Sequence, residues 1–146
     1  MTMIDSTAAT AALQDVHTAT NDVLEGYREM ARRAQPDVRP VIDRLVALHQ
    51  RHAGEQAALL APRSGAEVGD TSLQGTVNKA VVIVRDWFTD IDRGTLPAVR
   101  KGEQSLRETY EQALRDGDVP ADHAAAALLR TQLADLEREI AALPQQ

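Results

Sequence analysis

The strongest constraint on the fold is a repeat along the chain with an offset of 83 to 84 residues. Tyr27 recurs as Tyr110 after 83 residues, and the segment 55–59 (EQAAL) recurs as 139–143 (EIAAL) after 84. Each copy contains two amphipathic helical segments separated by a short break, so each copy predicts a helical hairpin. Two hairpins can bury their apolar faces against each other, which predicts a four-helix bundle.

Apolar residues spaced three and four apart predict five helices. The expected ranges are about 8–34, 37–61, 72–93, 95–117 and 120–143, with Ser6 or Thr7, Asp37 and Ser72 as N-caps of the first three. The expected inward residues include Leu13, Val16, Val23, Tyr27 and Met30, then Ile42 and Leu45, then Val99, Leu106 and Tyr110, then Leu129, Leu133, Leu136 and Ile140. The third helix is long enough to run the length of the bundle between the hairpins. This all-α arrangement of two hairpins and a crossover helix is ferritin-like.

A chain of 146 residues is long enough for one domain with a real core. We expect residues 8–143 to form a single ferritin-like helical-bundle domain, residues 1–7 to be a disordered N-terminus and residues 144–146 to be a short tail. Aromatic residues make up only 3%, so the core must be aliphatic and alanine-rich. Trp87 and Phe88 are expected to pack in the crossover helix or to form part of a dimer surface.

The composition argues against several classes of function. The net charge is −6 and the sixteen basic residues are spread along the chain, which argues against nucleic-acid binding. There is no cysteine, so disulfides and thiolate chemistry are excluded. No apolar stretch reaches the roughly 18 to 20 residues of a membrane span, and the N-terminus lacks the pattern of a signal peptide. We therefore expect a soluble, cytoplasmic protein.

Comparison of the two copies shows where they differ in polarity. An offset of 83 aligns Thr20 with Glu103, and an offset of 84 aligns His49, His52 and Gln56 with Leu133, Leu136 and Ile140. Ferritin-like di-metal proteins place an inward Glu on each of two helices and a Glu-x-x-His motif on each of the others. This chain has no Glu-x-x-His motif, and Glu25 and Glu29 fall on the outer face of the first helix. A complete di-metal site is therefore not expected.

The remaining inward polar residues leave several hypotheses open. Glu103, His49 and His52 are candidate metal ligands, for iron, manganese or zinc; without a metal no cofactor is expected. A buried carboxylate costs several kcal/mol unless it is paired, so Glu103 alternatively forms a structural hydrogen bond with His49, His52 or Tyr27, or is partly exposed near a helix end. The two histidines are alternatively a neutral, hydrogen-bonded pair in the core, or face outward. His17 and His123 are expected to be isolated surface residues.

Three segments resemble a known family: 22–31 (DVLEGYREMA), 101–110 (KGEQSLRETY) and 72–75 (SLQG). They resemble the bacterial ferritin-like bundle family known as domain of unknown function 2383, over roughly residues 10–143. The resemblance implies a ferritin-like four-helix bundle without an assigned role, and it supplies no catalytic residues. The family tends to have His-Arg where this chain has Asn78-Lys79. The family also has a late His in its last helix, which this chain lacks near Glu137. Both departures weaken an inference of metal binding.

Two hypotheses for function follow. In the first, the chain is a non-enzymatic bundle with a structural or interaction role, self-associating as a homo-oligomer and linked to stress. In the second, it is a degenerate metal-binding protein that uses Glu103 with His49 and His52. A third, weaker hypothesis is a carrier of small apolar ligands in the alanine-lined interior.

Overall fold

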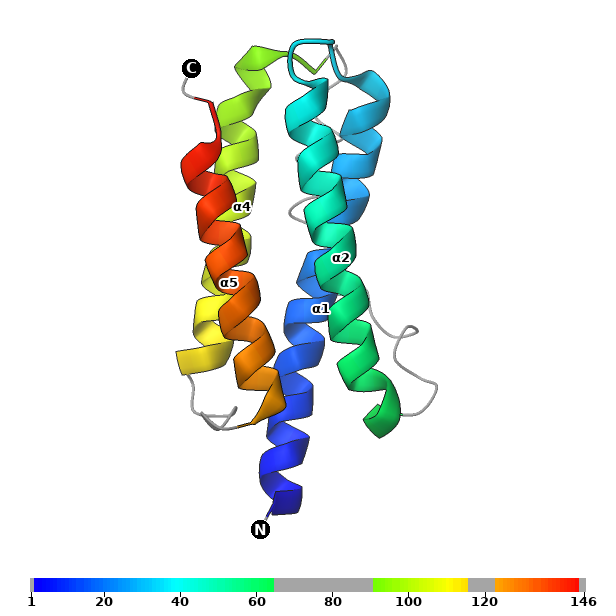
Figure 1. Cartoon of the computed structure of the whole chain (residues 1–146), viewed down its shortest axis with the longest axis vertical. Helices are drawn as coiled ribbons and strands as arrows, with labels where there is room; N and C mark the ends of the chain where they lie inside the picture. Colours follow the sequence, from blue (N-terminus) through cyan, green and yellow to red (C-terminus); the bar gives the residue numbers. More distant parts are fainter. Residues whose placement is uncertain (1, 65–90, 116–122, 145–146) are drawn as a thin grey trace.

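The computed structural model describes the backbone of residues 2–64, 91–115 and 123–144, and side chains from residue 8 onward, except 61–64, within these ranges. This part of the chain contains helices α1 (Thr2–Arg33), α2 (Arg39–Ser64), α4 (Leu96–Arg115) and α5 (Ala124–Ala142), and the 3-10 turn η1 (Arg93–Thr95). The described ranges contain no strand, so the expected all-α class is confirmed (Figure 1).

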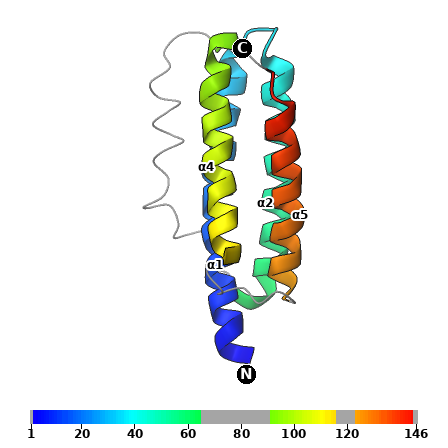
Figure 2. The same cartoon turned by 90° about the vertical axis from the view of Figure 1, so that its left-hand side faces the viewer.

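The four helices stand side by side as two antiparallel hairpins. α1 pairs with α2, α4 pairs with α5, and the hairpins face each other so that α4 packs on α1 and α5 on α2 (Figure 2). The last residues of α2 and the first residues of α4 lie at opposite ends of the bundle (Figure 1). The crossover helix expected over residues 72–93 falls outside the described residues, apart from its last three positions, and Trp87 and Phe88 fall outside them as well.

Several helix ends differ from the sequence-based prediction. α1 begins at Thr2, so Ser6 and Thr7 are inside the helix and do not cap it. No Gly or Pro precedes Ala8 to stop the helix, which therefore includes residues 2–7 that we expected to precede it. α2 begins at Arg39 and not at Asp37, because Val38 supplies the carbonyl that Ile42 N–H bonds at 3.1 Å.

The start of α5 was also predicted wrongly. The helix begins at Ala124, four residues after Pro120, because His123 is its N-cap. The backbone of His123 is extended, and its ring Nδ1 accepts the N–H of Ala125 at 3.0 Å. A side-chain acceptor satisfies one of the free N–H groups at a helix start. His123 is therefore a structural residue and not an isolated surface histidine.

The core consists of two apolar clusters with polar side chains between them. One cluster includes Leu13, Val16, Leu60, Leu106, Leu129 and Leu136, and the other Met30, Ile42, Leu45, Ile91 and Val99. Along α2, the buried polar residues His49, His52 and Gln56 fall between Leu45 and Leu60. Along α4, Glu103 falls between Val99 and Leu106. We call the inward-facing stripe of each helix its seam. The helices therefore bring the polar residues of their seams together in the middle of the bundle.

The Arg100 side chain of α4 binds the C-terminal end of α5. Its guanidinium donates to the carbonyl oxygens of Ile140 at 3.1 Å and Leu143 at 3.2 Å. Pro144 holds Leu143 in an extended conformation, since the residue before a proline avoids the helical region, and this ends α5. The last carbonyls of a helix have no partner within it, and a cation there also interacts favourably with the helix dipole.

We predict that Arg100→Met lowers the free energy of unfolding by about 1–3 kcal/mol, because hydrogen bonds from a charged donor are lost while the aliphatic stem remains. Denaturant titration followed by circular dichroism measures this. Lys101→Met, at the exposed neighbouring position, is the matched control and should change stability by no more than about 0.5 kcal/mol. Equal effects of the two substitutions would contradict a role for the guanidinium.

Candidate functional site

Glu103 is the centre of the buried polar site. Its side chain is fully buried, and its Oε2 accepts hydrogen bonds from the Tyr27 hydroxyl at 2.7 Å and from His49 Nε2 at 2.8 Å. The three residues come from α4, α1 and α2, so a single carboxylate oxygen joins three helices. The alternative of a structural hydrogen bond therefore holds for Glu103, with both a tyrosine and a histidine as partners. The alternative of partial exposure near a helix end is wrong.

The rings around Glu103 also contact each other. The Tyr27 and His49 rings are stacked, with centroids 5.7 Å apart, and the His49 and His52 rings meet edge to face at 6.1 Å. His49 and His52 are three residues apart on α2, a spacing that puts both side chains on one helix face. Both are fully buried, so the outward-facing alternative for these histidines is wrong.

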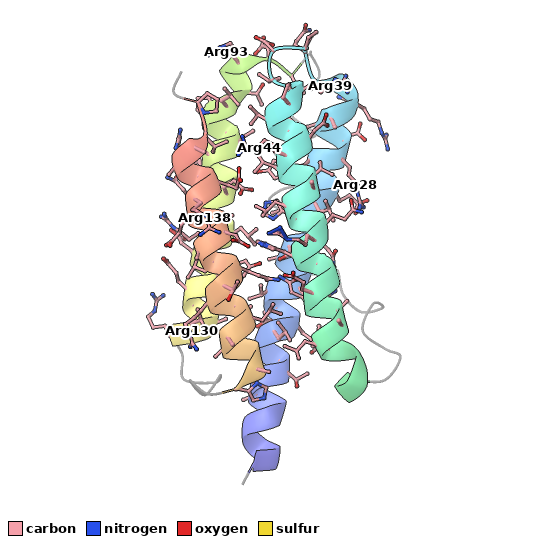
Figure 3. The ribbon with its side chains drawn as sticks, in the orientation of Figure 1. Arg28, Arg39, Arg44, Arg93, Arg130 and Arg138 are labelled. Carbon is pink, nitrogen blue, oxygen red and sulfur yellow. The ribbon has the colours of Figure 1, made fainter. Side chains whose placement is uncertain are left out.

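His52 reaches a different carboxylate. Its Nε2 lies 3.1 Å from Oδ2 of Asp135 on α5, and Arg51 donates to the same oxygen at 3.0 Å. Arg138 bonds the other oxygen, Oδ1, of the same carboxylate. Asp135 is at the edge of the bundle, with its side chain 18% exposed. Arg138 is labelled in Figure 3, on the outer side of α5.

A second polar network is centred on Gln56. Its Nε2 lies within hydrogen-bonding distance of three oxygens: Tyr110 Oη at 2.9 Å, Gln132 Oε1 at 2.8 Å and Thr20 Oγ1 at 3.2 Å. Its Oε1 lies 3.0 Å from Nδ1 of His17. Thr20, Gln56, Tyr110 and Gln132 belong to α1, α2, α4 and α5, so this network joins all four helices.

The donors and acceptors of this second network fit together. The Tyr110 hydroxyl donates to Gln132 Oε1 at 3.0 Å, and Gln132 Nε2 donates to Glu55 Oε1 at 2.9 Å and to the His52 carbonyl at 3.2 Å. Each amide therefore uses both its oxygen and its nitrogen. The network runs from half-buried His17 on one side of the core to exposed Glu55. His17 is thus a member of a core network, where we expected a surface residue.

Burial sets the protonation of several groups in the site. Burial raises the pKa of the Tyr27 hydroxyl well above its usual range, and the Glu103 carboxylate raises it further, so the hydroxyl stays a donor. Burial lowers the pKa of His52 more than its hydrogen bond with Asp135 raises it. At Asp135, burial raises the pKa, but the hydrogen bonds with His52 and Arg51 outweigh it, and the pKa is lowered.

The contacts around Glu103, including His49 and His52, form a first network, which we call the Glu103 network. Three of its buried atoms have no hydrogen-bond partner: Glu103 Oε1, His49 Nδ1 and His52 Nδ1. These belong to the three residues that the sequence singled out as candidate metal ligands. The structure joins Glu103 to His49 directly, whereas His52 pairs with Asp135. Across residues 2–64, 91–115 and 123–144, no group of three or more His, Asp or Glu side chains is arranged to hold a metal ion.

The sequence missed two members of the site, Gln132 and Asp135. We expected Leu133 to face inward, but Leu133 is half-buried and Gln132 is fully buried. Gln132 lies three residues after Leu129 and four before Leu136, so the helical spacing alone would have found it. Asp135 lies beside the seam and reaches His52 from its edge, and the seam pattern carries no signal for such a contact.

Comparison with known proteins identifies the family. A family model described as Domain of unknown function (DUF2383) matches residues 8–116. The chain belongs to the DUF2383 family. The DUF2383 match covers α1 from residue 8 onward, all of α2 and α4, and ends before α5, so it is shorter than the resemblance that we expected to reach residue 143. Neither a search of curated proteins nor a search of solved structures returned a significant match.

None of the helices in the described part of this DUF2383 chain has an apolar stretch long enough to cross a lipid bilayer.

We predict that Glu103→Leu lowers the free energy of unfolding by about 2–5 kcal/mol, because it leaves the Tyr27 hydroxyl and the His49 N–H buried without an acceptor. Glu103→Gln should cost less, since its amide oxygen can accept both bonds. Exposed Glu108 on the same helix gives the control Glu108→Leu. If the three variants were equally stable in denaturant titration, the bonds to Glu103 would not be structural.

We predict that the protein loses stability as the pH falls through about 6.5, the usual pKa of histidine. The pKa of His52 is lowered in the folded state, so the unfolded chain binds a proton first and unfolding becomes easier. The contribution of His52 to the free energy of unfolding is fully present above about pH 6.5 and is lost as the pH falls. His52→Gln, which keeps an N–H for Asp135, should reduce the slope of unfolding free energy against pH. An unchanged slope in this variant would refute the assignment.

Proposed function

We propose that this chain is a ferritin-like bundle that acts as a structural or interaction module, is not an enzyme, and lacks a complete di-metal site. The arrangement of the hairpins supports the fold type. α2 ends and α4 begins at opposite ends of the bundle (Figure 1), as they do in ferritin-like folds, whose two hairpins are joined by one long crossover connection.

Reciprocal contacts of the two tyrosines support the internal repeat. Tyr27 donates to Glu103. The Tyr110 hydroxyl and the Thr20 hydroxyl both lie within hydrogen-bonding distance of the same atom, Gln56 Nε2. Thr20 aligns with Glu103 in the repeat, as Tyr27 aligns with Tyr110. Each tyrosine therefore approaches the seam residue of the other copy, as expected for two hairpins related by an approximate two-fold axis.

The observation that carries the proposal is the fate of the ligand-type side chains. Glu103 Oε2 is occupied by Tyr27 and His49, and the place that would hold a second inward carboxylate holds Thr20. The Thr20 hydroxyl donates to the Val16 carbonyl at 2.8 Å within its own helix. Leu136, which aligns with His52, is fully buried and apolar. Neither α1 nor α5 therefore offers a ligand at the position that aligns with Glu103 or His52, where a di-metal site needs one.

The proposed role includes self-association as a homo-oligomer in a bacterial cytoplasm and a part in the response to stress. The absence of cysteine from the whole sequence suits a reducing compartment. The mixed surface charge, with ion pairs such as Arg44–Glu139 at 2.9 Å between α2 and α5, suits contacts with another protein surface.

The test combines aerobic titration with Fe²⁺ and measurement of mass in solution. We expect fewer than two iron ions per chain, no oxidation of Fe²⁺ faster than in protein-free buffer, and a mass above that of one chain by light scattering. Two bound ions with fast oxygen-dependent oxidation would overturn the non-enzymatic proposal. A monomeric mass at every concentration would remove self-association from it.

A second candidate function is metal binding by Glu103, His49 and His52, for an ion such as iron, manganese or zinc. The three buried atoms without a partner favour it, since one belongs to each of these residues. It predicts that His52→Ala lowers the metal content of the purified protein in elemental analysis. Unchanged metal content in that variant would dispose of it.

A further inference from the structure

The two histidines of α2 have the same arrangement of protons. His49 Nε2 faces a carboxylate oxygen of Glu103 at 2.8 Å, and His52 Nε2 faces one of Asp135 at 3.1 Å. A carboxylate accepts a hydrogen bond, so in both rings Nε2 carries the proton. A neutral imidazole has only one N–H, and its other nitrogen then carries a lone pair. The hydrogen-bond network therefore assigns a bare Nδ1 to both residues.

These two bare nitrogens have no partner in the described structure. Both Nδ1 atoms are buried and make no hydrogen bond, although each ring is fully enclosed. A second proton on His49 would put an N–H in the same buried place without an acceptor.

The carboxylates behind the rings are themselves held in place. Tyr27 donates to Glu103 at 2.7 Å, and Arg51 and Arg138 bond the two oxygens of Asp135. Metal-binding histidines commonly donate their second ring N–H to a carboxylate, which fixes the tautomer and the ring orientation. His49 and His52 both have this support.

We propose that His49 and His52 form a binding site for one borderline transition-metal ion, such as Zn²⁺ or Ni²⁺, ligated through both Nδ1 atoms. Glu103 and Asp135 then orient the rings and are not ligands. The ring centroids are 6.1 Å apart. Two metal–nitrogen bonds of about 2.0–2.1 Å, added to the distance from each ring centre to its Nδ1, span this spacing with a wide nitrogen–metal–nitrogen angle. Imidazole nitrogen suits Zn²⁺ and Ni²⁺, whereas Mg²⁺ and Ca²⁺ prefer oxygen.

This inference rests on the second candidate function but assigns different ligands. Two protein ligands agree with the absence, within the described ranges, of a three-residue metal group. In zinc sites that keep an open position, water or a substrate completes the coordination beside the protein ligands. Asp135 is 18% exposed, so the His52 side of the site lies nearest to solvent.

The test is equilibrium dialysis of the full chain against Zn²⁺, with the metal counted by elemental mass spectrometry. We expect one Zn²⁺ per chain. His49→Gln and His52→Gln each keep an N–H for their carboxylate but remove the Nδ1 lone pair, and should each weaken binding at least about tenfold. Asp135→Asn should weaken binding by about 10–100-fold through the loss of ring orientation. His123→Asn, which keeps the helix cap, is the matched control and should bind as the parent does.

X-ray absorption of the zinc-loaded parent protein gives a second readout that needs no variant. It should show two imidazole ligands per zinc ion. Zinc that remains bound to the His49→Gln/His52→Gln double variant overturns the proposal. If the absorption spectrum instead shows a carboxylate ligand that Glu103→Gln removes, the inference fails and the carboxylate site of the second candidate function stands. If the parent binds neither Zn²⁺ nor Ni²⁺, the inference fails, and the second candidate function is then decided by its own test, the metal content of the His52→Ala variant.

Discussion

A carboxylate enclosed by an apolar bundle fixes the position of the helices more tightly than the apolar contacts do. Aliphatic side chains tolerate small shifts, whereas the bonds of Glu103 to Tyr27 and His49 have lengths of 2.7 and 2.8 Å. Sliding α4 by one helical turn, about 5.4 Å, would break both bonds and leave a buried charge without a partner. The contact therefore sets the register of the second hairpin against both helices of the first.

The Gln56 network adds a constraint at a second level of the bundle, and it differs in kind. It contains no buried charge, it takes one residue from each of the four helices, and its amide oxygens and nitrogens all have partners. Fully satisfied polar networks favour one arrangement of a core over its alternatives. The Glu103 network joins three helices but leaves lone pairs without partners. The two networks therefore differ in how fully their polar atoms are hydrogen-bonded.

Helical spacing was enough to predict the bundle and the inward positions of Glu103, His49, His52 and Gln56, because an apolar face shows which positions point inward. Helical spacing also fits Gln132, but a leucine at the next position offered a more hydrophobic stripe, so Gln132 was not predicted. Helical spacing failed at Asp135, because a side chain beside the seam can reach a partner that periodicity does not specify. Helix ends failed where a single side chain decides them, as His123 does for α5.

The atoms left without partners in the Glu103 network share one chemical property. Glu103 Oε1, His49 Nδ1 and His52 Nδ1 are all lone-pair donors in the assigned tautomers, and none is an N–H or O–H. Each such buried group costs about 1–3 kcal/mol. A core needed only for register could avoid this cost with amides, as the neighbouring network does, or with leucine, as at Leu136. Retaining imidazoles with bare nitrogens has a physical rationale when an electron-pair acceptor such as a cation binds there.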